Sequence, residues 1–151
     1  MAELLRLATL ALLAVAAGAS FATQAAVNAS LRAGLGSPAW AAFVSYAGGT
    51  LAMLAVLLAT RAPWPRADAI AGSPWLAWTG GLFGAVYVVI LIVLLPRLGS
   101  AATLALFVAG QMLASLAFDQ FGLLGLSRHP AGVARWAGAA LLVAGAVLVR
   151  G

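Results

Sequence analysis

Cysteine and lysine are absent from this 151-residue chain, which has only one histidine and three acidic residues. Without cysteine there is no disulfide framework, thiol nucleophile or thiolate metal site, and one histidine excludes a multi-histidine metal centre within one chain. No glycine-rich phosphate cradle, Ser/His/Asp set or carboxylate pair is visible. We therefore expect no enzyme, no metal site and no cofactor.

Charged side chains of either sign are scarce. They make up 7% of the chain against 65% hydrophobic residues, and the mean hydropathy is +1.11. A soluble domain carries about 25% charged residues, so the expected solvent is a lipid bilayer. The net charge of +5 comes from arginines between or at the ends of apolar segments, where topology signals belong. No basic face interleaved with aromatic residues is visible, which disfavours nucleic-acid binding.

Five apolar stretches fill almost the whole chain, each roughly long enough to cross a bilayer core of about 30 Å as a helix. They predict an all-α integral membrane protein, with one membrane domain over residues 1–151 and five transmembrane helices. The expected spans are approximately residues 4–31, 38–60, 75–95, 100–118 and 131–149.

Serine and proline mark the predicted helix starts. Ser37-Pro38 and Ser73-Pro74 each place a capping hydroxyl before a proline at the first turn, and Ser100 can cap the fourth span.

Proline and glycine also mark breaks and close contacts. Residues 61–73 form the longest expected loop, Pro96 interrupts the chain after the third span, and Pro130 opens the fifth. Gly80 and Gly84 have the GxxxG spacing that lets helix backbones approach closely in lipid.

The first span could in principle be a cleaved signal peptide. Glu3 and Arg6 leave its start nearly neutral, and its apolar run is longer than that of a typical signal peptide. Small residues near Phe21 keep cleavage open as the alternative to the uncleaved span that we expect.

Five spans would place the two termini on opposite sides of the membrane. With the N-terminus inside, the inner side carries Arg6, Arg61, Arg66, Arg128 and Arg135. The outer side then carries Arg32, Arg97 and Arg150. So small a difference in arginine number allows insertion in both orientations. Two oppositely oriented copies would give ten helices related by a two-fold axis in the membrane plane, as in many transporters.

Polar side chains recur every fourth residue in the first span, at Ser20, Gln24 and Asn28. Amides at membrane depth need partners, so this face is expected to line a substrate cavity or, alternatively, to bond neighbouring helices. Tyr87 is a further candidate for the cavity, although its hydroxyl could instead be satisfied by a neighbouring carbonyl.

The fourth span repeats the spacing with Gln111, Ser115 and Asp119. Gln111 and Ser115 are candidates for the same cavity. Asp119 could take up a proton or bind a cation, because burial raises the pKa of a carboxylate. Alternatively it is a helix-end residue paired with Arg128 or Arg135.

Several short motifs together resemble a known family. They are Gln24-Ala-Ala-Val-Asn28, Ser37-Pro38, Gly48-Gly49-Thr50, Trp78-Thr-Gly80-Gly81-Leu-Phe-Gly84, Pro96-Arg-Leu-Gly99, Gly110-Gln111 and Asp119-Gln-Phe-Gly122. The pattern is similar to that of a small five-span bacterial family in the drug/metabolite transporter superfamily, long catalogued as a domain of unknown function.

The resemblance implies half of a ten-helix inverted-repeat transporter fold, working in the bacterial inner membrane as an antiparallel pair that exports metabolites or drugs. It places Gln24, Asn28, Gln111 and Asp119 at the central cavity. The related four-span multidrug transporters carry a glutamate inside their first helix, which this chain lacks, so their proton exchange does not transfer directly.

Three functions follow as hypotheses. The leading one is a secondary transporter of a small molecule, acting by alternating access as an antiparallel homodimer or with a paralogue. A non-transporting membrane scaffold or accessory subunit would use its polar residues to hold helices together. A lipid-handling protein would use arginines at helix ends to hold membrane lipid headgroups.

Overall fold

The computed structural model describes residues 1–150, without the side chains of Ala2 and Arg150. Two features of the sequence analysis lie outside the described residues. They are Gly151, the last residue of the expected domain, and the side chain of Arg150, one of the arginines assigned to the outer side. The described chain consists of helices and their connections and contains no strand. It divides into two compact units, Met1–Val93 and Leu94–Gly151.

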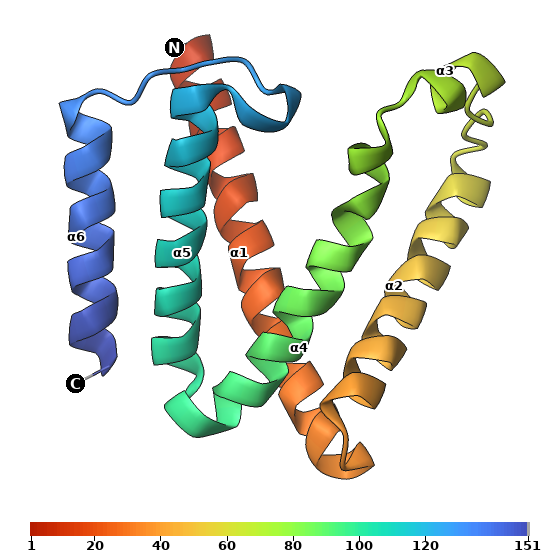
Figure 1. Cartoon of the computed structure of the whole chain (residues 1–151), viewed down its shortest axis with the longest axis horizontal. Coiled ribbons are helices and arrows are strands. Elements are labelled where there is room, and N and C mark those ends of the chain that lie inside the picture. The colour runs from red at the N-terminus through yellow and green to blue at the C-terminus, as the bar shows by residue number, and fades with distance from the viewer. Residues whose placement is uncertain (151) are drawn as a thin grey trace. The chain divides into compact units, whose positions relative to one another are not determined.

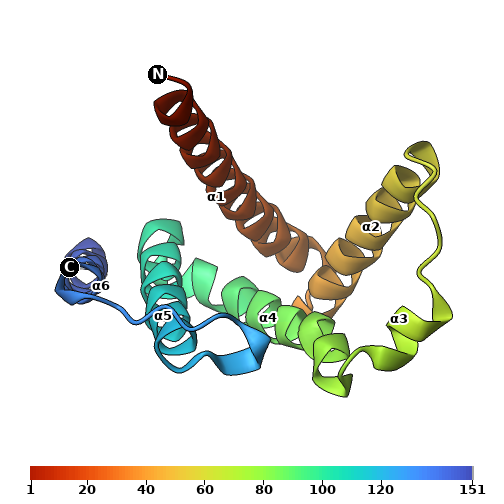
Figure 2. The ribbon, with the colours of Figure 1, turned by 90° about the horizontal axis from the view of Figure 1, so that it is seen from above.

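The first unit begins with two helices joined by a tight corner, from which they diverge (Figures 1 and 2). α1 (Ala2–Leu35) ends at Gly36, whose φ of 67° lies in the left-handed region that suits glycine. α2 (Pro38–Ala59) follows at once, and Ser37 Oγ accepts an N–H of its first turn at 3.3 Å. The helix start predicted at Ser37-Pro38 is confirmed.

α1 is longer than the predicted span over residues 4–31. Its 34 residues cover about 51 Å at 1.5 Å per residue, against a bilayer core of about 30 Å. Part of α1 must therefore tilt or lie outside the hydrocarbon core.

The segment after α2 departs from the prediction. The expected loop over residues 61–73 contains a short helix, α3 (Ala67–Gly72). Ser73 does not cap the next helix, because its hydroxyl donates to a carbonyl four residues earlier at 2.8 Å. A 3₁₀ helix, η1 (Trp75–Thr79), then precedes the α-helix that begins at Gly80.

α4 (Gly80–Leu98) continues through Pro96, although the third span was predicted to end before this proline. The proline removes one backbone hydrogen bond from the helix without ending it. The helix ends at Gly99, whose φ of 79° is a conformation that residues with a Cβ rarely adopt.

The second unit contains α5 (Ser100–Phe121), a 3₁₀ turn η2 (Leu123–Gly125) and α6 (Val133–Arg150). α5 and α6 pack side by side (Figures 1 and 2). The prediction that Ser100 caps the fourth span is wrong: Gly99 holds the capping position, and no side-chain hydrogen bond caps the helix. α6 begins two residues later than predicted.

Four helices in the described chain are long and apolar enough to cross a membrane. They cover Glu3–Leu35, Pro38–Ala59, Trp75–Leu98 and Ser100–Phe121. The apolar helix Val133–Val149 is shorter, at about 26 Å for its 17 residues. Four of the five expected spans are thus supported by length and composition, and the fifth is not.

The core of the first unit lies where small residues of α2 meet α4. Ala41 and Ala42 pack against Val88 and Ile92, and the Ile92 side chain is fully buried. Most large apolar side chains are instead exposed, including those of the first half of α1. Such a surface suits lipid or another apolar protein surface and not water.

Candidate functional site

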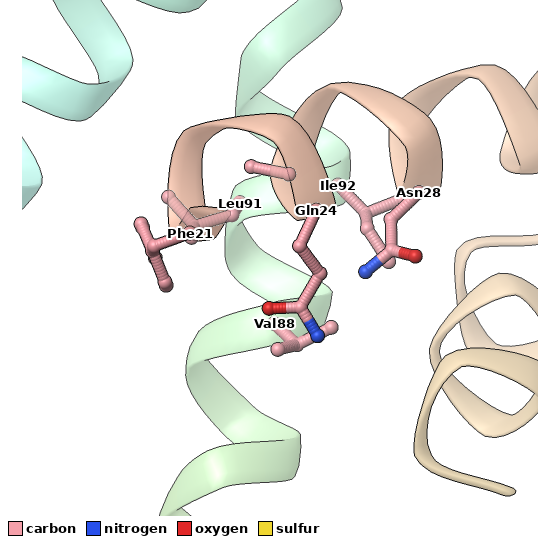
Figure 3. Close-up of a pocket in the computed structure, with 7 residues that line it drawn as sticks. Phe21, Gln24, Asn28, Val88, Leu91 and Ile92 are labelled. Atoms are coloured by element: carbon pink, nitrogen blue, oxygen red, sulfur yellow. The ribbon is translucent and has the colours of Figure 1, made fainter. Parts of the chain in front are cut away.

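Two amides of α1 and the apolar face of α4 enclose a small cavity in the first unit. Gln24 and Asn28 lie one helical turn apart and approach Val88, Leu91 and Ile92 of α4 (Figure 3). The cavity measures about 10 Å³, which is room for about one water molecule. Both amides therefore border this small cavity, and their contact with a substrate stays a prediction.

Asn28 is the more deeply buried of the two amides. It is 4% exposed, and its side chain makes no hydrogen bond to another described residue. Its polar atoms keep some accessible surface, since among the described residues only Thr103 Oγ1 is a fully buried side-chain polar atom without a partner. The Asn28 amide is therefore open to a partner that the described residues do not supply.

Gln24 lies at the open side of the cavity. Its side chain is exposed, and Nε2 donates to Ser45 Oγ of α2 at 3.4 Å. This long bond ties α1 to α2 beside the cavity.

Ser20 does not line the cavity and is exposed. Four residues rotate an α-helix by about 40° more than a full turn, so successive members of the series drift around the helix. Ser20 is two such steps from Asn28 and faces elsewhere. Of the three predicted residues, Gln24 and Asn28 thus border the cavity and Ser20 does not.

An aromatic cluster stands beside the cavity and joins three helices. The ring centroids of Phe21 in α1 and Tyr87 in α4 are 6.0 Å apart. The Tyr87 side chain also interacts with Tyr46 of α2. The Tyr46 hydroxyl fits against Gly84, where a Cβ would come within 2.5 Å of it. Phe21 was not predicted to belong to the site.

Arg32 lies beside the cavity without lining it, and the sequence analysis treated it only as a topology signal. It lies four residues after Asn28, is half-buried, and donates from Nη1 to the Ile92 carbonyl oxygen at 3.4 Å. Pro96 explains why this oxygen is available, because proline has no N–H for the carbonyl four residues earlier. The proline is visible in the sequence, but the approach of α4 to Arg32 is not.

Gln111, Ser115 and Asp119 lie along α5 in the second unit, but they do not share one groove. Asp119 and Ser115 border an open groove of about 430 Å³ between α5 and α6. Gln111 borders a second groove of about 530 Å³, again with Ser115. Ser115 is thus common to both grooves, and Gln111 and Asp119 are on different ones.

Asp119 is paired with Arg135 of α6, with 3.5 Å between Oδ2 and Nη1, and both side chains are partly exposed. Arg128, the other expected partner, instead donates from Nε to the Gln120 carbonyl at 2.9 Å. The His129 N–H donates to the Asp119 carbonyl at 2.8 Å. The loop after α5 therefore satisfies the last carbonyls of that helix.

Metal-binding chemistry finds no support within residues 1–150, where no group of three or more histidine, cysteine or acidic side chains comes together.

Comparison with known proteins identifies the family. A family model described as "Putative inner membrane exporter, YdcZ" matches residues 9–148. No curated protein and no solved structure matches the chain. The match confirms the resemblance to a small family of the drug/metabolite transporter type, and its description is that of a transporter and not of an enzyme. With its apolar helices able to span a membrane, the chain belongs to this family of inner membrane exporters.

Proposed function

We propose that the protein exports a small molecule across the inner membrane by alternating access, as an antiparallel dimer. The observation that carries this proposal is the buried amide of Asn28, which lines a cavity beside Gln24 and makes no hydrogen bond within the described chain. A transported solute would supply the missing hydrogen-bond partner in the solute-bound state, and water would supply it in the solute-free state.

The proposed half-transporter requires α6 to be the fifth span. Its apolar part is a few ångströms shorter than the bilayer core, a mismatch that local thinning of the bilayer can accommodate at small cost. Arg135, in the first turn of the helix, can extend its guanidinium towards the headgroups.

Two features favour a second, inverted copy as the partner. The arginines give only a weak orientation signal, which permits both insertions. Gln24 is exposed at the open side of the cavity, so a facing copy would close it. A paralogue of opposite orientation would serve equally well.

In this proposal Gln24 and Asn28 contact the solute, and the ring of Tyr87 beside Phe21 forms an apolar wall. Gln111 and Ser115 are proposed to line the solute path from α5. Asp119 is the candidate for proton or cation coupling, since it is partly exposed at its groove and is held by a single long ion pair.

The test is solute flux from liposomes containing the purified protein. The trapped solutes are labelled amino acids, sugars and carboxylic acids, with ethidium as an organic cation. We expect wild-type protein to release at least one of them faster than protein-free liposomes do. Asn28→Ala and Gln24→Ala should slow that release at least about ten-fold, since each removes a polar contact with the solute.

Thr23→Ala is the matched control, because Thr23 lies on the same helix, is exposed, and bonds only to the Ala19 carbonyl of its own helix. It should leave flux unchanged. Unaltered flux in both amide variants, with normal expression, would refute the site. Absence of wild-type flux for every solute would refute the transport function and favour a scaffold.

A further inference from the structure

We propose that Arg32 is the anion-binding residue of this cavity and that the substrate is an organic anion with an apolar, aromatic body. The inference rests on the proposed transport function and names its substrate class. It is carried by the charge of Arg32, the amide of Asn28 and the apolar wall of α4.

The charge of Arg32 has no acidic partner within the described residues. Asp68 pairs with Arg66 at 3.1 Å, and Asp119 pairs with Arg135 in the other unit. Glu3 lies 29 residues earlier on the same helix, about 43 Å away along its axis. Water screens a half-buried cation less than a fully exposed one, so an anion gains by binding beside it.

The donors of Arg32 are also largely unused. A guanidinium carries five N–H donors, and the described contacts of Arg32 use one of them, in the 3.4 Å bond to the Ile92 oxygen. A planar donor of this kind can bind both oxygens of a carboxylate at once. The Ile92 oxygen holds the guanidinium against α4, one helical turn from Asn28, without consuming its charge.

The rest of the cavity indicates the body of the ligand. Its walls are the side chains of Val88, Leu91 and Ile92, and Phe21 stands with Tyr87 at its edge. The enclosed space is far smaller than an aromatic ring, so the ring would lie on the open side of the cavity, towards Gln24. Asn28 can donate a further hydrogen bond to the anion, and an organic cation would be repelled by Arg32.

Three probes of nearly the same size and different charge test this inference: benzoate, benzamide and benzylammonium. Binding to the purified full-length protein is measured by calorimetry in a neutral detergent. We expect benzoate to bind about 10- to 100-fold more tightly than the other two, as one or two charge-assisted hydrogen bonds would give. In Arg32→Gln this preference should disappear.

Arg97→Gln is the matched control. Arg97 is exposed in the last turn of α4, and the sequence places it on the same side of the membrane as Arg32. It should keep the preference for benzoate. If Arg32→Gln does not fold, Pro96→Ala combined with Arg32→Gln replaces it, because alanine returns an N–H to the Ile92 oxygen.

Equal binding of the three probes, or a benzoate preference that survives loss of Arg32, would overturn the inference. So would binding of phosphatidylglycerol in place of benzoate, which would make the anion a lipid headgroup. These outcomes are separate from failure of the transport function, since flux of a neutral solute or of ethidium could still be present in liposomes.

Discussion

At the scale of single residues, Gly84 decides how the aromatic cluster fits together. An alanine Cβ there would meet the Tyr46 hydroxyl at 2.5 Å, and the Tyr46 side chain also interacts with Tyr87. We expect Gly84→Ala to lower the free energy of unfolding by about 1–2 kcal/mol, because the tyrosine must move or the helices must separate. Denaturant or thermal unfolding in detergent measures the change.

Two variants make this measurement specific. Gly81→Ala is the control on the same helix, since a Cβ at Gly81 meets nothing within 4 Å. Tyr46→Phe should relieve the clash and lessen the effect of Gly84→Ala. A Gly84→Ala variant as stable as Gly81→Ala would contradict this account of the cluster.

The sequence predicted which polar residues lie within the helices better than it predicted which residues they contact. The spacing placed Ser20, Gln24 and Asn28 on one helix face. In the structure Gln24 and Asn28 border the same small cavity, whereas Ser20 is turned away because each four-residue step adds about 40°. Their contact with a substrate stays a prediction. Arg32 was interpreted only as a topology signal, and its role depends on a carbonyl that only the folded α4 brings near. Gly84 was assigned to helix packing, and its described neighbour is the Tyr46 side chain of α2.

At the scale of helices, Pro96 and Arg32 form one stabilising unit. Arg32→Gln should lower the free energy of unfolding by about 1 kcal/mol in the wild-type background. This is below the range of about 1.5–3 kcal/mol for a bond that involves a charged group, because the bond is long at 3.4 Å. In the Pro96→Ala background the cost should fall towards zero, since alanine supplies the Ile92 oxygen with an N–H. Unfolding of the four proteins of this double-mutant cycle measures the coupling.

Additive effects of the two substitutions would contradict this assignment. Arg97→Gln in both backgrounds again serves as the control, since its side chain makes no bond to the described residues.

The helix boundaries show what local chemistry can predict. Ser37-Pro38 caps a helix as predicted, because the first turn needs only residues adjacent in sequence. The same dipeptide at Ser73-Pro74 does not, since Ser73 bonds backward into α3, a helix that the prediction had taken as loop. Pro96 failed as a helix end because a carbonyl that loses its N–H can find another donor from elsewhere in the fold.

At the scale of the whole molecule, orientation is the property that most constrains function. Because the chain has no cysteine, Ala71→Cys in the loop over residues 61–73 creates a single exposed thiol. We expect an impermeant thiol reagent to label about half of the molecules from outside before the cells are permeabilised, as the weak arginine bias allows.

Ser100→Cys is the complementary position. Ser100 is exposed at the start of the fourth predicted span, and one predicted span separates it from Ala71, so it should lie on the other side of the membrane. With two orientations both positions label by about half. Labelling of one position alone would establish a single orientation and contradict the inverted homodimer, leaving an oppositely oriented partner or a scaffold.

The membrane class and helical content followed from composition alone, because only helices and closed barrels satisfy backbone groups in lipid. The number of spans did not follow as securely, because the last apolar helix covers only about 26 Å over residues 133–149. The loop before it folds back onto the end of α5. That loop depends on bonds between Asp119 or Gln120 and residues about ten positions later, which no periodic pattern reveals.

The bond between Arg32 and the Ile92 oxygen has a consequence for the proposed anion site. It would hold the guanidinium against α4 before the anion arrives, while four of the five N–H donors stay free. A side chain that is already ordered loses less conformational entropy when its ligand binds. The proposed site would therefore need little rearrangement at each cycle of binding and release.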